Sequence, residues 1–208
     1  SDIITKDNFS ISSEIKKYKV IGIGPGLGMS KLVIKNFKQI INEVNYPIVV
    51  DADGLNILSK DKDLFEKLPK ESILTPHIGE FKRFAGNFEN SNEKIMLQRR
   101  ISKKYGLNIV LKGPYTTMTD SKGGLYINTS GNSGLATAGS GDVLTGIITG
   151  LLAQNYTPFN AMISGVFLHG LSADIAVKKS HVNSLIASDI TENLSSAFKA
   201  LEKVITSN

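Results

Sequence analysis

The stretch NTSGNSGLATAGSGDVLTGIITGLLAQ, residues 128–154, combines six glycines and one carboxylate with an apolar run. Glycine permits positive φ angles and a close approach of the backbone to a ligand. The small and large apolar residues after Asp142 predict a buried helix, and the first N–H groups of a helix have no partner within it. A glycine-rich loop that leads into a helix N-terminus is typical of a phosphate site.

Asp142 is the single carboxylate of this stretch. At a site that gathers negative charge, a carboxylate is better suited to accepting a proton than to binding the anion. The pattern therefore favours phosphoryl transfer to a hydroxyl, with Asp142 as the base. The alternative is structural, because the helix dipole favours an acid in the first turn of any helix. The local pattern supports both interpretations.

The length of 208 residues and the hydrophobic fraction of 41% predict a single globular domain over residues 1–208. No apolar run reaches the roughly 18 residues that a membrane span needs, and the first residues lack a signal-peptide pattern. The absence of cysteine excludes disulfides and thiolate zinc sites and fits a reducing compartment. We therefore expect a cytoplasmic protein with no membrane partner.

The formal net charge of +5 comes from scattered basic residues with short clusters such as Arg99–Arg100 and Lys103–Lys104. No long basic stripe alternates with aromatic residues, so we expect no nucleic-acid partner. A basic surface also steers an anionic nucleotide toward a binding site.

Strands and helices are expected to alternate along the chain. Apolar segments predict strands at 18–23, 47–51, 72–75 and 108–111, with helices at 30–44, 55–59, 80–84 and 92–105 and a helical turn ending near 68. A hairpin is then expected from 116–119 and 125–128, followed by helices at 142–154, 158–178 and 188–204. This order predicts an α/β fold whose mainly parallel sheet presents its ligand site at the carboxyl ends of the strands.

Four polar or glycine-rich segments directly follow the predicted strands: IGIGPGLG (21–28), DADGLN (51–56), LTPHIGEF (74–81) and LKGPYTT (111–117). The fold is expected to place them around one crevice. The first segment does not match the dinucleotide-binding fingerprint G-x-G-x-x-G. The last glycine of that pattern would be Leu27 if the pattern began at Gly22, and Met29 if it began at Gly24. Asp51 and Asp53 are candidates to hold Mg²⁺ through water molecules. In the alternative interpretation, which we favour, Asp53 caps the helix that follows.

Single residues in these segments allow two interpretations each. His77 follows Pro76 on a loop after a strand, where a histidine often contacts a ligand, although a lone histidine is a weak signal. Glu80 either has a functional role or lies in the first turn of a helix because the dipole favours an acid there. Lys112, beside Gly113, either pairs with a phosphate or is solvated. His169 lies within the apolar segment VFLHGLSA and is expected to be a packed side chain.

Taken together, these residues resemble the ADP/ATP-dependent NAD(P)H-hydrate dehydratases of the ribokinase-like superfamily. The resemblance runs from about Ile21 to Leu194 through GPGLG, DADGLN, TPHIGEF, LKG, GNSGLATAGSGDVLTGI, VFLHGLSAD and SLIASDI. It implies a three-layer α/β/α fold that ends in a hairpin and helices. It also implies a repair reaction, in which the ring hydroxyl of hydrated NADH or NADPH is phosphorylated and phosphate is then eliminated. ADP or ATP would donate the phosphoryl group, with Mg²⁺ on the donor phosphates.

The resemblance also implies site residues by position. The hydrated dinucleotide would contact Gly28, His77, Ile78, Gly79, Glu80, Phe81, Lys82, Arg83 and Asp142. The phosphate donor would contact Lys112, Gly113, Pro114, Tyr115, Thr116, Asn132, Ser133, Gly134, Ala138, Gly139, Ser140 and Gly141. Asp142 would be the base, and the backbone N–H groups of residues 139–142 would form the anion hole. No protein ligand to a metal is implied.

Members of the family have further strands and a helix before the position of Ser1. Because sheet edges are normally covered, we expect a preceding segment or a second chain to complete the sheet, and a homo-oligomer. The alternative function is a small-molecule kinase of the same fold, similar to hydroxyethylthiazole kinase. Such a kinase shares the GSGD loop but stops at phosphorylation, and TPHIGEF favours the dehydratase.

Overall fold

The computed structural model describes residues 11–206. Its sheet has the strand order β1-β2-β3-β4-β5-β6. The strands are β1 (Gly22–Ile23), β2 (Val49–Val50), β3 (Ile73–Leu74), β4 (Asn108–Leu111), β5 (Thr117–Thr119) and β6 (Leu125–Ile127). The first four are parallel, and β5 and β6 add to β4 as an antiparallel hairpin. The prediction of an α/β fold with a mainly parallel sheet is confirmed.

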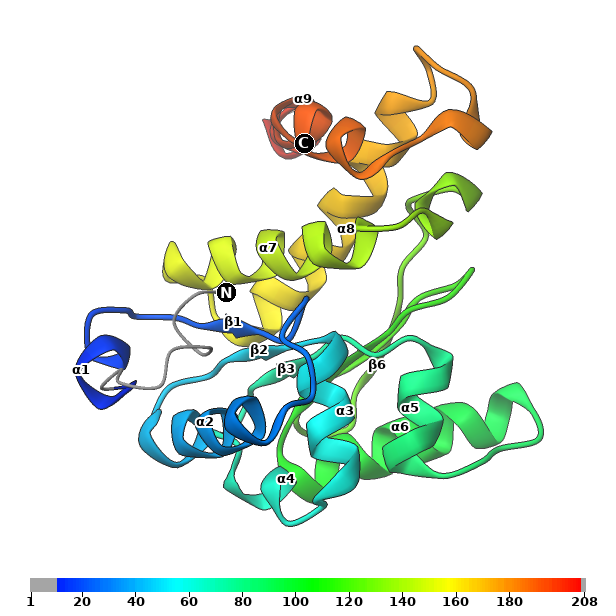
Figure 1. Cartoon of the computed structure of the whole chain (residues 1–208). Helices are drawn as coiled ribbons and strands as arrows, with labels where there is room; N and C mark the ends of the chain where they lie inside the picture. The colour runs from blue at the N-terminus through cyan, green and yellow to red at the C-terminus, as the bar shows by residue number, and fades with distance from the viewer. Residues whose placement is uncertain (1–10, 207–208) are drawn as a thin grey trace.

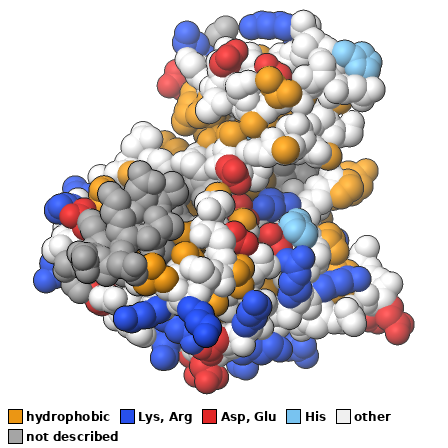
Figure 2. All heavy atoms as spheres, viewed as in Figure 1, with side chains coloured by type: hydrophobic (Ala, Val, Ile, Leu, Met, Phe, Trp, Pro, Cys, Tyr) orange, Lys and Arg blue, Asp and Glu red, His pale blue; other side chains and the backbone are white. Residues whose placement is uncertain are grey.

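Helices cover both faces of this sheet (Figure 1). One layer contains α1 (Ile11–Ile15), α2 (Lys31–Glu43), α3 (Ala52–Lys60), α4 (Leu64–Lys67), α5 (Ile78–Ala85) and α6 (Ser91–Tyr105). The other contains α7 (Ser140–Ala153), α8 (Pro158–Ala176) and α9 (Ala187–Thr206), with the short 3-10 helices η1 (Ser133–Ala136) and η2 (Val182–Ser184). In Figure 2 the molecule narrows between the part that carries α9 and the layer below the sheet.

Successive strand residues point to opposite faces, which explains the three layers. Val50 and Leu74 join the core that contains Phe37 of α2. Val49 and Ile73, one position earlier, join the core beneath α7 and α8. All five side chains are 0% exposed, so helices cover both faces of β2 and β3, whereas Ile127 of the edge strand β6 is 56% exposed. The predicted three-layer α/β/α architecture is therefore confirmed.

The predicted boundaries hold best where a cap defines them. α2 begins after Ser30, whose Oγ accepts a hydrogen bond from the Val33 N–H at 3.3 Å. β1 is shorter than the predicted strand at 18–23, and Tyr18 is half exposed. The predicted capping by Asp53 is wrong, because α3 starts at Ala52 and Asp51 is its N-cap residue. Ala52 has a φ of 46°, a left-handed conformation that costs energy in a residue with a side chain.

Within the described residues, β1 and β6 each pair with one other strand. The expected segment or second chain beside β1 stays a prediction, as does the single-domain organisation over residues 1–208, because residues 1–10 and 207–208 lie outside the described part. No helix in residues 11–206 is long and apolar enough to cross a bilayer.

Gly24, at the end of β1, leaves no room for a side chain next to the Asp51 backbone, and this close approach can be tested by mutation. Its φ is +136°, and a Cβ added to it would lie 1.7 Å from the backbone oxygen of Asp51. We expect Gly24→Ala to lower the free energy of unfolding by about 3 kcal/mol or more. Gly26 has a φ of +65° with open space around it, so Gly26→Ala should cost only about 1 kcal/mol. Urea denaturation of both variants measures the difference, and equal losses would contradict the close approach.

Candidate active site

The segments that follow β1 to β4 meet the N-terminus of α7 at one edge of the sheet. Residues His77 and Lys112 form a parallel bridge just beyond β3 and β4, and the Lys112 N–H donates to the Pro76 oxygen at 2.8 Å. A Cβ added to Gly141, in the first turn of α7, would lie 3.1 Å from Lys112 Nζ and 3.6 Å from an Asp51 carboxylate oxygen. The structure thus places the glycine-rich loop beside the strand ends.

A buried carboxylate joins these elements. Asp51 is 1% exposed, and its Oδ1 accepts a hydrogen bond from Lys112 Nζ at 2.9 Å. Its Oδ2 accepts one from Thr145 Oγ1 of α7, also at 2.9 Å. A buried charge is tolerated only when it is paired and hydrogen-bonded, and both oxygens meet that condition. Asp51 therefore holds the Lys112 ammonium beneath the start of α7, a role that the sequence pattern did not reveal.

A second chain of hydrogen bonds links three of the predicted segments. The Gly28 N–H donates to Asp53 Oδ2 at 2.8 Å, and Asn56 Nδ2 donates to Asp53 Oδ1 at 3.2 Å. Arg83 Nη1 in turn donates to Asn56 Oδ1 at 2.7 Å. Two residues expected at the substrate site, Gly28 and Arg83, are thus connected through the DADGLN segment. Asp53 and Asn56 belong to this cluster as positioning residues.

His77 and Glu80 form a capping box at the start of α5. His77 Nδ1 accepts from the Gly79 N–H at 2.9 Å and the Glu80 N–H at 3.4 Å, and the His77 N–H donates to Glu80 Oε2 at 2.8 Å. An imidazole that accepts at Nδ1 carries its proton on Nε2. His77 Nε2 lies 3.4 Å from Glu80 Oε1, so this proton points toward the Glu80 carboxylate, while the His77 side chain as a whole is 54% exposed. Glu80 is buried and acts structurally.

The remaining residues of this segment differ in their exposure. Phe81 is 0% exposed and packs its ring against Phe84 and Phe88, so its side chain belongs to the core rather than to the candidate site. Lys82 is exposed and lies over the Phe88 ring, 4.7 Å from its centre. Of the expected substrate contacts at the start of α5, the exposed face therefore presents His77 and Arg83.

The glycine-rich loop is held from behind by α8. Asp174 accepts hydrogen bonds from the Gly131 N–H at 2.8 Å and from Asn132 Nδ2 at 2.9 Å. Asn132 Oδ1 accepts from the Gly134 N–H at 3.0 Å and so caps η1. Sequence reasoning missed Asp174, although it lies within the quoted segment VFLHGLSAD. The loop is therefore shaped by the protein without a ligand.

The first turn of α7 is open. Gly139 is its N-cap residue with a φ of 80° and caps it with no side-chain hydrogen bond. Asp142 follows in the first turn with an exposed side chain. The other expected donor contacts, Gly113, Pro114, Tyr115, Ser133 and Ala138, are exposed in the two adjoining loops. The Ser140 N–H donates to the Thr137 oxygen at 3.4 Å, which leaves the N–H groups of Gly141 and Asp142 for a ligand. These groups, a nearby ammonium and an exposed carboxylate fit an anion together with a proton acceptor.

His169 supports this turn from below and is packed, as the sequence predicts. It is 8% exposed, and its Nε2 lies 3.2 Å from Ser140 Oγ and 3.0 Å from the Ser140 oxygen. Burial lowers the pKa of His169 to about 4; the Ser140 backbone bond opposes this shift and the charge of Lys112 adds to it. His169 is therefore neutral near pH 7.

The residues at this edge do not form a protein site for a metal ion. All four carboxylate oxygens of Asp51 and Asp53 accept hydrogen bonds within the protein. Among residues 11–206, no group of three His, Cys, Asp or Glu side chains is arranged to hold a metal. The interpretation of Asp51 and Asp53 as Mg²⁺ holders is therefore not supported, and a metal ion would have to arrive on the phosphates of a ligand.

The three-layer fold, with a glycine-rich loop at the carboxyl edge of its mainly parallel sheet, places this protein among the ribokinase-like α/β proteins. The chain belongs to the family whose model is described as NAD(P)H-hydrate dehydratase, which matches residues 2–196.

Two curated relatives illustrate the match. The ADP-dependent (S)-NAD(P)H-hydrate dehydratase of Neisseria meningitidis is 38% identical over 192 residues, which cover 89% of this chain and 64% of that protein. The bifunctional NAD(P)H-hydrate repair enzyme Nnr of Moorella thermoacetica is 35% identical over 188 residues, again 89% of this chain but 36% of that protein. The chain thus spans about a third of the bifunctional relative.

Solved structures agree on the fold. The ADP/ATP-dependent NAD(P)H-hydrate dehydratase of Bacillus subtilis, co-crystallised with ATP and Mg²⁺, has a TM-score of 0.76 and 31% identity, covering 88% of this chain and 65% of that chain. A hydroxyethylthiazole kinase from Pyrococcus horikoshii has a TM-score of 0.72 at 15% identity, which shows a shared fold alone.

Two threonines one turn apart in α7 test the role of Asp51. Thr145→Val removes a hydrogen bond to a buried carboxylate and should lower the free energy of unfolding by about 2 kcal/mol. Thr149 Oγ1 donates to the Thr145 backbone oxygen at 2.7 Å, so Thr149→Val removes a bond between uncharged groups and should cost less than about 1 kcal/mol. Chemical denaturation measures both, and equal losses would contradict the role assigned to Asp51.

His169 predicts a dependence of stability on pH. Its pKa is lowered from 6.5 to about 4, so between these values the unfolded chain binds a proton that the folded chain does not. The stabilisation is complete above pH 6.5 and is lost as the pH falls toward 4, by up to about 3 kcal/mol. The difference in unfolding free energy between wild type and His169→Gln, measured at several pH values, should shrink over this range. A constant difference would show that His169 does not titrate this way.

Proposed function

We propose that this protein dehydrates hydrated NADH or NADPH at the expense of ADP or ATP. The observation that carries the proposal is the exposed Asp142 in the open first turn of α7, beside the Lys112 ammonium that Asp51 holds in place. Membership of the family and the names of the relatives support the choice of substrate.

The proposed reaction begins when Asp142 accepts the proton of the ring hydroxyl of the hydrate. The hydroxyl oxygen attacks the terminal phosphorus of the donor, and the donor leaves with one phosphate fewer. The backbone N–H groups at residues 139–142 and the Lys112 ammonium stabilise the charge on the transferring group. Phosphate then leaves from the ring carbon and the neighbouring ring carbon gives up a proton to solvent, which restores the nicotinamide double bond. Holding the two reactants in line contributes much of the acceleration.

One group of residues binds the hydrate and a second group binds the phosphate donor. Gly28, His77 and Arg83 surround the hydrate, with Asp53 and Asn56 keeping Gly28 and Arg83 in place. The segment 112–116 and the loop at residues 132–141 hold the phosphate donor. Both sets lie at the same edge of the sheet, so one ligand reaches the other across the first turn of α7.

Mg²⁺ belongs to the donor in this proposal. The described residues offer no carboxylate cluster for it, whereas the Bacillus subtilis relative was crystallised with ATP and Mg²⁺. When bound, the ion would neutralise charge on the donor phosphates. A homo-oligomer, a cytoplasmic location and a further polypeptide beside β1 stay predictions of the sequence.

The test supplies hydrated NADH with ADP or with ATP and follows the recovery of nicotinamide absorbance. We expect turnover by wild type and a loss of at least about a hundredfold in kcat for Asp142→Asn, because the base is removed. Nucleotide binding by the variant, measured by calorimetry, should be retained. Glu66→Gln changes another acid in the first turn of a helix, α4, and should keep full activity.

Three results would contradict this proposal. Normal turnover by Asp142→Asn would show that another group is the base. Equal losses in Asp142→Asn and Glu66→Gln would point to a general effect of charge. Phosphorylation of an alcohol without recovery of nicotinamide absorbance would favour the small-molecule kinase.

A further inference from the structure

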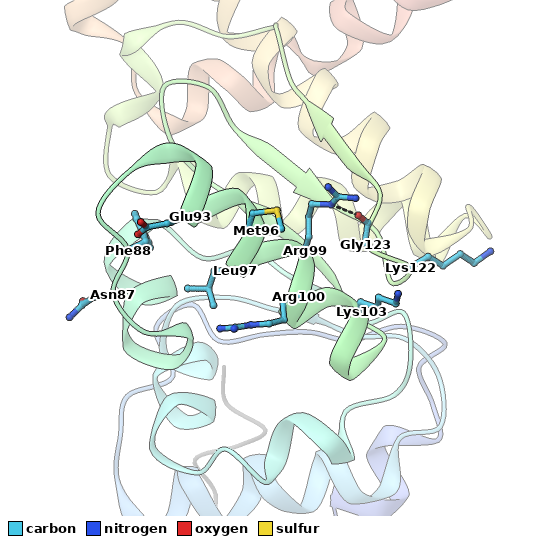
Figure 3. Close-up of a pocket in the computed structure, with 10 residues that line it drawn as sticks. All are labelled: Asn87, Phe88, Glu93, Met96, Leu97, Arg99, Arg100, Lys103, Lys122 and Gly123. Carbon is cyan, nitrogen blue, oxygen red and sulfur yellow. Dashed lines mark hydrogen bonds between the residues drawn. The ribbon is translucent and has the colours of Figure 1, made fainter.

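A basic cavity of about 680 Å³ lies beside α6, and we name it the α6 pocket. Its lining includes Phe88, Met96, Arg99, Arg100, Lys103 and Lys122, and Figure 3 shows these side chains around it. A second cavity of about 410 Å³ adjoins it, since Arg100 and Leu97 line both. Volumes of this size are typical of small-molecule sites, which span roughly 300–1,000 Å³.

The α6 pocket lies at the opposite end of the sheet from the candidate active site. Lys122 belongs to the turn between β5 and β6, and the neighbouring Ser121 N–H donates to Asn108 Oδ1 at 3.1 Å. Asn108 begins β4, whereas Lys112 directly follows its end. The α6 pocket shares no lining residue with the predicted site, so a ligand in it would be a second ligand.

The lining of this pocket contains four cations and one carboxylate. Arg99, Arg100 and Lys103 lie on α6, and Lys122 lies on the neighbouring hairpin turn (Figure 3). The carboxylate is Glu93, whose oxygens are occupied by the Glu89 N–H at 2.8 Å and Asn90 Nδ2 at 2.9 Å.

The positive charge of the pocket is not compensated within the protein. In residues 11–206 no ion pair joins Arg100, Lys103 or Lys122 to an acidic side chain. Figure 2 shows further Lys and Arg side chains over the helices of this layer.

The walls of the α6 pocket are fixed in advance. Arg99 Nε donates to the Gly123 oxygen at 2.8 Å and ties the hairpin turn to α6. Asp120 Oδ1 accepts from the Lys122 N–H at 2.9 Å, which sets the position of Lys122. The buried Gln98 side chain donates to the Ile109 oxygen at 3.1 Å and anchors α6 on β4. The backbone that carries the cations is therefore fixed, whereas the side chains of Arg100, Lys103 and Lys122 are exposed and would close on a ligand.

The α6 pocket also has an apolar side. Phe88 packs on the core through Phe81, with ring centres 6.3 Å apart. Met96 is 58% exposed, an unusual position for a large apolar side chain, and it lines the same cavity. Lys82 covers one face of the Phe88 ring, 4.7 Å from its centre, so a flat ring would meet the rest of Phe88 and the polarisable thioether of Met96. Arginine forks, in turn, match the geometry of phosphate oxygens.

We propose that the α6 pocket is a second binding site, for a nucleoside di- or triphosphate. The phosphates bind Arg100, Lys103 and Lys122, and the base packs against Phe88 and Met96. This site is independent of the dehydratase reaction proposed above.

The experiment titrates the full chain with ATP by calorimetry at fixed ionic strength. Wild type should bind two ATP molecules per chain. Arg100→Gln/Lys103→Gln should weaken one site at least about tenfold, because two charged contacts are lost. Lys16→Gln/Lys19→Gln removes the same charge near α1, on the far side of the molecule in Figure 1, and should keep both sites. Lys112→Gln should weaken ATP binding at the candidate active site alone. If Lys112→Gln leaves both sites unchanged, that result counts against the proposed function and not against the α6 pocket.

Two further probes separate the parts of the ligand. Inorganic tripolyphosphate should bind the α6 pocket more weakly than ATP. Met96→Gln should weaken ATP without changing tripolyphosphate, because it alters the apolar side alone. Unchanged ATP binding by Arg100→Gln/Lys103→Gln, or equal losses in that variant and in Lys16→Gln/Lys19→Gln, would overturn the proposal. Binding of a polynucleotide but of neither ATP nor tripolyphosphate would overturn it in favour of a nucleic-acid surface.

Discussion

The buried carboxylate of Asp51 is the constraint on which the arrangement of this edge depends. Its two oxygens bind an ammonium that follows β4 and a hydroxyl in α7, so one side chain connects the end of β2 with the end of β4 and with α7. The backbone of Gly24 presses against the Asp51 oxygen and adds the end of β1 to the same point. A charge this deeply buried is stable only with both partners present. The positions of Lys112 and of the start of α7 are therefore set together.

This arrangement prepares the edge of the sheet for an anion. α7 begins at a glycine that offers no capping side chain, so its first N–H groups stay available, and Lys112 adds a positive charge beside them. Asp174 shapes the loop from α8, and the neutral His169 supports Ser140 without adding charge. Across the edge, the hydrogen bonds from Gly28 to Arg83 give the second ligand a defined wall. The proposed phosphoryl transfer needs both walls, because its rate depends on the alignment of two reactants.

The α6 pocket shows a different way of presenting positive charge. At the candidate active site the ammonium of Lys112 is balanced by Asp51, whereas the cations of the α6 pocket have no acidic partner in the described residues. A surface region lined by charge of one sign attracts ligands of the opposite sign, so the α6 pocket attracts anions at the other end of the sheet from the candidate active site.

The sequence by itself determined the order of elements and the position of the glycine-rich loop before α7. Alternating apolar segments, the Ser30 cap and the apolar helix predicted at 142–154 reflect local physics, namely side-chain periodicity and capping, and the structure has these elements, with α7 at Ser140–Ala153. Only the tertiary structure decided the partners of Asp51 and Asp53, the burial of Phe81 and the role of Asp174. These depend on contacts between residues far apart in the chain, and a local pattern carries no information on which distant group a carboxylate will meet. The α6 pocket has the same origin, because its cations on α6 meet Lys122 only when the hairpin folds back onto that helix.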